Sequence, residues 1–196
     1  MTKRNILAAV LMFMAAGSAN AALINFTGEI EYHNDVVFTY FTVEDDATDV
    51  RVWTDSFMSG ENFDPIAALW SSDGSLIMQN DDNDGINPDT QTYYDSGFFL
   101  DNLAAGEYIF SVSTYNNFAN GSSLSDGFRF DDQDSILLSE WCQPANTCGM
   151  GPNWSVWLDG VDSARSPDAT VPEPSSVALL GLGLAALGFS RRKSKA

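Results

Sequence analysis

Residues 80–85 read Asn-Asp-Asp-Asn-Asp-Gly and carry side-chain oxygens at alternate positions. Asn80, Asp82 and Asp84 stand two residues apart, and Gly85 follows the last of them. This spacing matches the first half of a calcium-binding loop, in which alternate oxygens converge on one ion and the glycine permits a sharp turn. We therefore expect calcium as the one cofactor, with Asn80, Asp82 and Asp84 as its ligands.

The second half of such a loop is missing. Gln91 stands where a bidentate glutamate would be, and no helical pattern flanks the segment. Asp89 or Asp95 would have to complete the coordination shell. A solvated turn rich in Asp and Asn is the alternative interpretation. A second acidic run, residues 131–134, has no glycine and matches the pattern less well.

Catalytic motifs are not apparent in the sequence. The sole histidine, His33, stands in an expected turn and has no nucleophile motif beside it. The numerous acidic residues could supply a glycosidase pair, but spacing singles out no two of them. We predict no catalytic residues and no enzymatic activity.

Cys142 and Cys148 are the only cysteines. In an exported chain, which the termini described below indicate, an even number predicts one disulfide that closes a small loop. Pro144 and Asn146 favour a turn between the two cysteines. A pair of metal-binding thiolates is the alternative, but the sequence offers no second cysteine pair.

The elements that must position these residues are predicted to be strands. Runs of aromatic and β-branched residues with a period of two recur between turn signals, and no helical pattern interrupts them. The expected strands cover residues 24–32, 36–43, 50–55, 66–70, 76–78, 93–94, 98–100, 107–112, 128–130 and 154–159. Such a series predicts an all-β protein with an antiparallel β-sandwich over residues 22–161, followed by a polar linker over residues 162–170.

Aromatic side chains are candidates for stacking on sugars where they are exposed, and core packing is the alternative for each. The candidates are Trp53, Tyr93, Tyr94, Trp141, Trp154 and Trp157.

Several short motifs follow one another in a recognisable order. They read FDPIAALW from Phe63, SDG from Ser72, NDD from Asn80, DSGF from Asp95 and LAAGEY from Leu103. Over residues 35–115 this order resembles the bacterial pre-peptidase C-terminal domain, a jelly-roll β-sandwich appended to many secreted proteins. The resemblance implies a jelly-roll-like sandwich and brings no generally assigned activity.

Residues 1–21 form an expected secretory signal peptide. Lys3 and Arg4 supply the charged beginning, residues 6–16 are apolar, and residues 19–21 read Ala-Asn-Ala, a pattern that signal peptidase cleaves. We expect the mature chain to begin at Ala22.

The C-terminal residues 171–196 have three consecutive parts. Pro172, Glu173 and Pro174 precede an apolar run over residues 177–189, which a basic end follows. The basic residues are Arg191, Arg192, Lys193 and Lys195. Such a run halts in a bilayer with the cations on the cytoplasmic side. As a helix, residues 175–190 span about 24 Å, against roughly 30 Å of hydrocarbon, so we expect a transient membrane helix; an ordinary single-span anchor is the alternative.

This three-part order resembles the PEP-CTERM sorting signal of Gram-negative bacteria. The resemblance implies recognition by an exosortase, a membrane cysteine transpeptidase, with cleavage near Pro172–Pro174. It also implies transient insertion in the inner membrane, followed by delivery to the cell surface or the extracellular matrix.

Removal of both ends makes the remaining chain more acidic than the formal net charge of −18 suggests. Of the 9 basic residues only Arg51, Arg129 and Arg165 remain, whereas of the 27 acidic residues only Glu173 is lost. Such a domain repels nucleic acid and anionic membrane surfaces.

We therefore expect an exported, exosortase-processed protein of the surface or matrix, with a non-enzymatic structural or adhesive role associated with exopolysaccharide or biofilm. The first alternative is a calcium-dependent carbohydrate-binding module, and the second is a secreted hydrolase.

Overall fold

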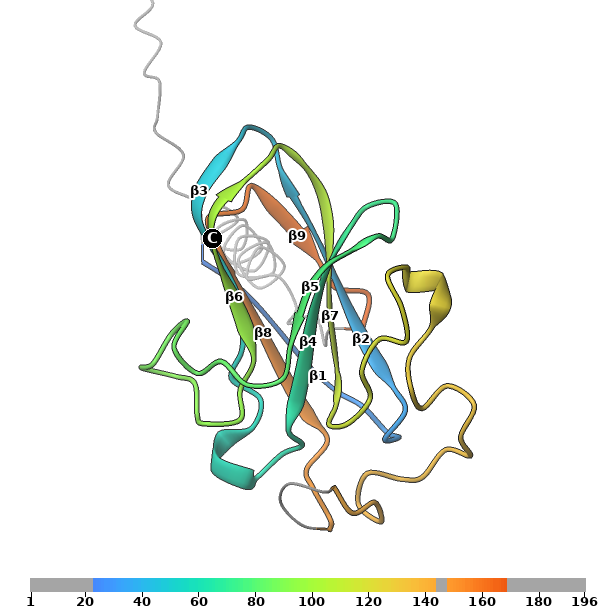
Figure 1. Ribbon diagram of the computed structural model, residues 1–196. Coiled ribbons are helices and arrows are strands. Elements are labelled where there is room, and N and C mark those ends of the chain that lie inside the picture. The colour runs from blue at the N-terminus through green and yellow to red at the C-terminus, as the bar shows by residue number, and fades with distance from the viewer. Residues whose placement is uncertain (1–22, 144–147, 169–196) are drawn as a thin grey trace, which may run out of the picture.

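The computed structural model describes residues 23–143 and 148–168 (Figure 1). Strands make up almost all of the regular structure in this part of the chain, and two short 3-10 turns interrupt them. In chain order the elements are β1 (Ile24–Glu29), β2 (Val36–Val43), β3 (Ala47–Thr54), η1 (Met58–Gly60), β4 (Pro65–Ser71), β5 (Leu76–Asn80), β6 (Gly97–Leu103), β7 (Gly106–Thr114), η2 (Leu124–Asp126), β8 (Asn153–Asp159) and β9 (Ser163–Arg165).

Two sheets face each other (Figure 1). One has four strands in the order β1-β8-β3-β6, and the other has five in the order β5-β4-β7-β2-β9. Every strand pairing is antiparallel. The predicted all-β antiparallel sandwich is confirmed.

The main core lies between the sheets because each strand alternates its side chains between two faces. In β2 the buried residues Val37, Phe41 and Val43 alternate with partly exposed ones. Strands β3, β7 and β8 contribute further fully buried side chains: Val50, Val52, Phe110, Val112, Val156 and Leu158. This alternation fixes which face of each strand meets solvent.

A second apolar cluster covers part of the outer face of the five-stranded sheet. In β4, Leu69 points into the main core, whereas Trp70 points outward and packs with Ile109 and Phe128. The indole N–H of Trp70 donates a hydrogen bond to Ser111 Oγ at 2.9 Å. The irregular segment between β7 and β8 (yellow in Figure 1), which carries Phe128, therefore packs over part of this outer face.

Two of the expected strands are irregular in the structure. Tyr93 and Tyr94 lie in turns, where both rings pack edge-on against Phe57 at centroid distances of 5.3 and 5.0 Å. Residues 128–130 also form turns, and only Phe128 makes an isolated bridge, to Ala119. Tertiary contacts of the aromatic rings decide the backbone here, against the local strand preference.

Strand pairing extends into the segment expected to be a linker. β9 pairs with β2, with Arg165 opposite Tyr40. The hydroxyl of Ser166 then donates to the carbonyl oxygen of Phe38 at 3.1 Å. The described part of residues 162–170 thus belongs to the sandwich, although its composition is polar, because an edge strand needs only one buried face.

No helix within residues 23–143 and 148–168 is long and apolar enough to cross a bilayer. The expected signal peptide, residues 1–21, and the expected sorting segment, residues 171–196, lie outside the described residues.

Candidate metal centre

Asp64 is a deeply buried carboxylate near the acidic loop. It immediately precedes β4 and is 2 % exposed. Its backbone N–H donates to Gln143 Oε1 at 3.2 Å, and its carbonyl oxygen accepts from the N–H of Tyr115 at 2.8 Å. These two bonds and the ring of Pro65 hold the backbone on both sides of Asp64.

The β4–β5 hairpin brings the acidic loop to Asp64. β5 runs antiparallel to β4, with Asn80 opposite Ala67. Asp81 and Asp82, which follow β5, therefore lie beside the residues that precede β4. Carboxylate oxygens of Asp64, Asp81 and Asp82 all lie within 4.8 Å of one another. Figure 1 shows this end of the hairpin at the lower end of the sandwich, near η1 and the loop between β5 and β6.

Three oxygens in this region are buried and have no hydrogen-bond partner: Asp64 Oδ1, Asp81 Oδ1 and Asn80 Oδ1. The side-chain amide nitrogen of Asn80 donates to the carbonyl oxygen of Gly97 at 2.6 Å, but the side-chain oxygen of Asn80 takes no part in this bond. Buried polar atoms almost always have a hydrogen-bond partner, so three unpartnered oxygens at this end of the β4–β5 hairpin need an explanation.

Burial and mutual repulsion raise the pKa values of these carboxyl groups. The pKa of Asp64 rises to about 8, first because the group is buried and then because of the charges of Asp81, Asp82 and Asp95. The pKa of Asp81 rises to about 6, through burial and the charge of Asp82. Burial and the charge of Asp84 also raise the pKa of Asp82. Without a cation, this site favours protonated carboxyl groups.

The structure brings together a different set of acids from the one that alternate spacing suggested. Asp82 belongs to the group, and Asn80 contributes one of the unpartnered oxygens. Asp84 is exposed and lies outside the group, which contains Asp64 and Asp81 instead. Asp84 and Gly85 lie in a turn, as expected, but the backbone of Gly85 does not have the left-handed conformation that favours glycine.

Asp95, which the sequence offered as a further ligand, has a structural role. Its Oδ1 accepts from the hydroxyl of Thr54 at 3.1 Å and the N–H of Phe57 at 3.0 Å. Its Oδ2 accepts from the N–H and the hydroxyl of Thr92 at 2.8 and 3.0 Å. These bonds occupy both oxygens and join the end of β3 to η1 and the acidic loop. Asp89 is exposed.

Replacement of Asp95 by alanine should lower the free energy of unfolding by about 3 kcal/mol, because it leaves several buried donors without an acceptor. Urea denaturation followed by tryptophan fluorescence measures the effect. The matched change Asp89→Ala removes an exposed carboxylate of the same loop and should change stability by less than about 0.5 kcal/mol. Equal effects of the two substitutions would rule out this role for Asp95.

The other residues singled out in the sequence are engaged in structure. Cys142 and Cys148 form the predicted disulfide. His33 is 1 % exposed, and its Nδ1 accepts from the N–H of Ile136 at 3.2 Å. In the second acidic run, Asp131 Oδ2 accepts from the N–H of Phe128 at 2.7 Å, which makes it a turn residue.

The six aromatic candidates for sugar stacking separate by exposure. The side chains of Trp53, Trp141 and Trp154 are buried, at 1, 9 and 1 % exposure. Tyr94 and Trp157 are partly exposed. Tyr93 is 58 % exposed, so it is the candidate best placed to meet a ligand.

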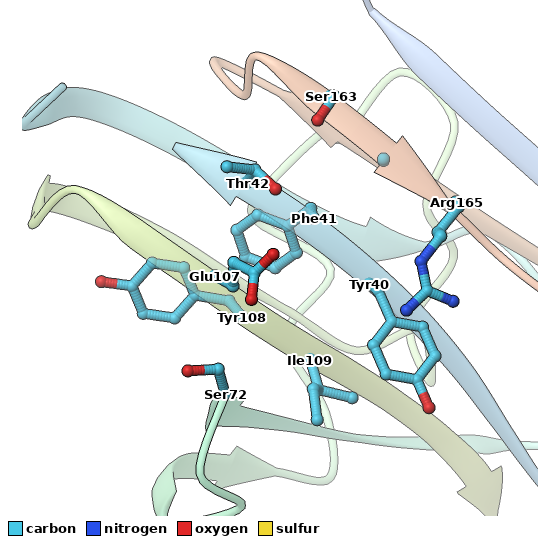
Figure 2. A pocket seen from close by; sticks show the side chains of 10 residues that line it. Tyr40, Phe41, Thr42, Ser72, Glu107, Tyr108, Ile109, Ser163 and Arg165 are labelled. Atoms are coloured by element: carbon cyan, nitrogen blue, oxygen red, sulfur yellow. The ribbon is translucent and has the colours of Figure 1, made fainter. Parts of the chain in front are cut away.

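A shallow pocket of about 370 Å³ lies on the outer face of β2, β7 and β9. Figure 2 shows Tyr40 and Arg165 side by side, and the guanidinium carbon lies 4.1 Å from the centroid of the tyrosine ring. Glu107 and Ser72 also line the pocket. The cation–π contact occupies one of the few cations of the domain, so this pocket offers little free positive charge to an anionic ligand.

Comparison with known protein families finds a match near the C-terminus of the chain. Residues 170–193 match the PEP-CTERM protein-sorting motif. No curated protein matches the chain. The motif indicates an exported protein that an exosortase processes, and it includes Pro172, Glu173, Pro174 and Arg191–Lys193, which lie outside the described residues.

Proposed function

We propose that this protein is a non-enzymatic component of the cell surface or the extracellular matrix, with a structural or adhesive role in association with exopolysaccharide. The observation that carries the proposal is the sorting motif at residues 170–193, which follows a strongly acidic sandwich. A signal peptidase would remove residues 1–21 during export, and an exosortase would then act near Pro172–Pro174.

The charge of the domain supports a role in solvent outside the cell. Within the described residues, Arg51 pairs with Asp159 and Arg165 lies over Tyr40, so two of the three arginines already have partners. The acidic surface that remains repels other anions, and it keeps the domain soluble at high local concentration.

The strand order supports a jelly-roll arrangement of the sandwich. Consecutive strands alternate between the sheets except at the β4–β5 hairpin. The first eight strands divide into β1-β8-β3-β6 and β5-β4-β7-β2, and β9 adds an edge strand beside β2. Two packed four-stranded sheets of this kind are the jelly-roll pattern. The order also agrees with the resemblance to the pre-peptidase C-terminal domain.

Fractionation of the producing cells tests the proposed destination. The processed protein should appear in the surface or matrix fraction, and a chain that ends before Pro172 should be lost from that fraction. A deletion strain should form less cohesive biofilm, and the full-length gene should restore it. Detection of the unprocessed chain in the cytosol, or an unchanged biofilm, would contradict the proposal.

A calcium-dependent carbohydrate-binding module is a second candidate, and the exposure of Tyr93 favours it. The ring of Tyr93 lies 4.5 Å from that of Tyr94, at the end of the loop that carries Asp81 and Asp82. A rigid, exposed tyrosine is a suitable surface for stacking on a sugar ring.

Replacement of Tyr93 by alanine should abolish glycan binding and leave the melting temperature within about 2 °C of the wild-type value, because the side chain is largely exposed. A glycan array with and without calcium measures the binding. The exposed Phe99, on the outer face of β6, provides the matched control Phe99→Ala. An array without any calcium-dependent signal from the wild-type protein would eliminate this candidate.

A further inference from the structure

We propose that Asp64, Asp81 and Asp82 bind one divalent cation, calcium, where the strands of the β4–β5 hairpin meet the acidic loop. This site goes beyond the proposed surface or matrix role. It would stand even if the protein had another destination, because it depends only on contacts within the sandwich.

The first argument is the buried and unpartnered side chain of Asp64. This side chain is 2 % exposed, and its Oδ1 has no hydrogen-bond partner among the described residues. The same carboxylate has an oxygen within 4.8 Å of oxygens of Asp81 and Asp82. Removal of a carboxylate from water without a partner costs several kcal/mol. An ion held between the three carboxylates would provide the missing partner.

The second argument is the spacing of the oxygens. Calcium binds oxygen ligands at about 2.3–2.6 Å, so two ligands on opposite sides of one ion are separated by about 4.6–5.2 Å. Three oxygens within 4.8 Å of one another lie within about 2.8 Å of a common point, so a small adjustment of the side chains lets all three carboxylates contact a single ion. Water can fill further coordination positions, as it does in many calcium sites.

The third argument concerns the kind of cation. The group offers only carboxylate oxygens, which hard cations prefer, and it includes no histidine or cysteine. Its loop ligands come from consecutive residues, and such irregular arrangements suit the flexible coordination of calcium better than the strict octahedron of magnesium. Calcium is therefore the expected occupant, and magnesium and zinc serve as comparison ions in the test.

A shared proton is the competing explanation for three close carboxyl groups. In that case protonation of Asp64 and Asp81 would replace the cation, and metal ions would leave the protein unchanged. The two explanations differ above the pKa of Asp64, where the protons are lost and a bound ion would remain. The experiment should therefore be performed at about pH 9.

The test measures the melting temperature of the processed protein, as its host releases it, in chelator and in calcium chloride. Saturating calcium should raise the melting temperature by roughly 5–10 °C. Titration calorimetry should give one calcium per chain. Magnesium should bind at least about tenfold more weakly, as the tighter geometric demand of that ion implies.

Two substitutions distinguish this site from general binding of calcium to an acidic protein. Asp64→Asn should abolish the calcium response and raise the melting temperature in chelator, because it removes a buried charge that has no partner. Asp84→Asn, in the same loop but outside the group, should retain the full response. Should Asp64→Asn fail to fold, the more exposed Asp82→Asn should still weaken calcium binding at least about tenfold.

An absence of calcium binding by the wild-type protein would overturn the proposal, as would loss of the response in Asp84→Asn. Retention of the full response in both Asp64→Asn and Asp82→Asn would also overturn it. None of these results bears on export or processing, which the fractionation experiment tests separately.

Discussion

In the presence of a chelator, the melting temperature should fall by about 5 °C or more as the pH rises from about 5 to about 9. The pKa of Asp64 is raised to about 8 and that of Asp81 to about 6 in the folded protein, from an ordinary value of 3.8. Both groups therefore bind protons more tightly in the folded than in the unfolded chain, and this proton binding stabilises the fold.

The sign follows from the order of these pKa values. The stabilisation is complete below the unfolded pKa of 3.8 and is lost as the pH rises through about 6 for Asp81 and through about 8 for Asp64. Asp82 and Asp95, whose pKa values are also raised by burial, act in the same direction. The metal-free protein should thus be less stable in mildly alkaline than in mildly acidic solution.

Differential scanning calorimetry over this pH range measures the effect. The variant Asp64→Asn should lose the part of the dependence above about pH 6, whereas Asp84→Asn should keep it. Saturating calcium should flatten the alkaline part of the curve, because a bound cation stabilises the ionised carboxylates. A melting temperature that rises with pH in chelator would contradict the assignment of these buried groups.

Replacement of Gly97 by alanine should destabilise the protein by about 3 kcal/mol and weaken calcium binding at least about tenfold. An added Cβ would lie 2.6 Å from Trp53 Cβ and 2.7 Å from the carbonyl oxygen of Val52. The second contact is with backbone, so β6 would have to move away from β3. The carbonyl oxygen of Gly97 accepts from the amides of Asn80 and Asn83 at 2.6 and 3.3 Å, so this movement would also displace the acidic loop.

Urea denaturation and calcium titration of the same preparation measure the two effects. Gly85→Ala is the matched control, because a Cβ there meets only Asn83 Oδ1, at 3.5 Å. This control should retain both stability and calcium binding. A Gly97→Ala variant with wild-type stability would show that β6 does not need this close approach.

The fold class could be predicted because it depends on local pattern. Alternation in β8 and the run of aromatic and β-branched residues in β2, with turn signals between such runs, identified most of the strands. The exceptions were Tyr93 and Tyr94, whose rings pack on Phe57, and residues 128–130, which form only an isolated bridge and turns. Such contacts join residues far apart in the chain, and sequence periodicity does not reveal them.

The candidate site could be predicted only in part. Alternate spacing pointed to the correct loop and to Asp82, but it also suggested the exposed Asp84. Asp64 was missed because it is separated from the loop by the whole β4–β5 hairpin. The predicted pairing of these two strands could have revealed Asp64. A hairpin places the residue before its first strand beside the residues that follow its second strand.

The structure places three of the many acidic residues of the chain close together at one end of the sandwich. Most carboxylates lie on the surface, but Asp64 is buried and lies close to Asp81 and Asp82. The charges that shift its pKa are all negative. If the site is occupied after export, the cation joins the start of β4 to the end of β5 and orders the loop that carries Tyr93. Calcium in the medium would then control the stability of this end of the sandwich.

A crystal structure of the processed protein, grown with calcium chloride at about pH 8, tests the site at atomic level. We predict one ion at about 2.3–2.6 Å from oxygens of Asp64, Asp81 and Asp82. An empty cluster in the presence of calcium, with the three carboxyl groups hydrogen-bonded to one another or to water, would contradict the cation site.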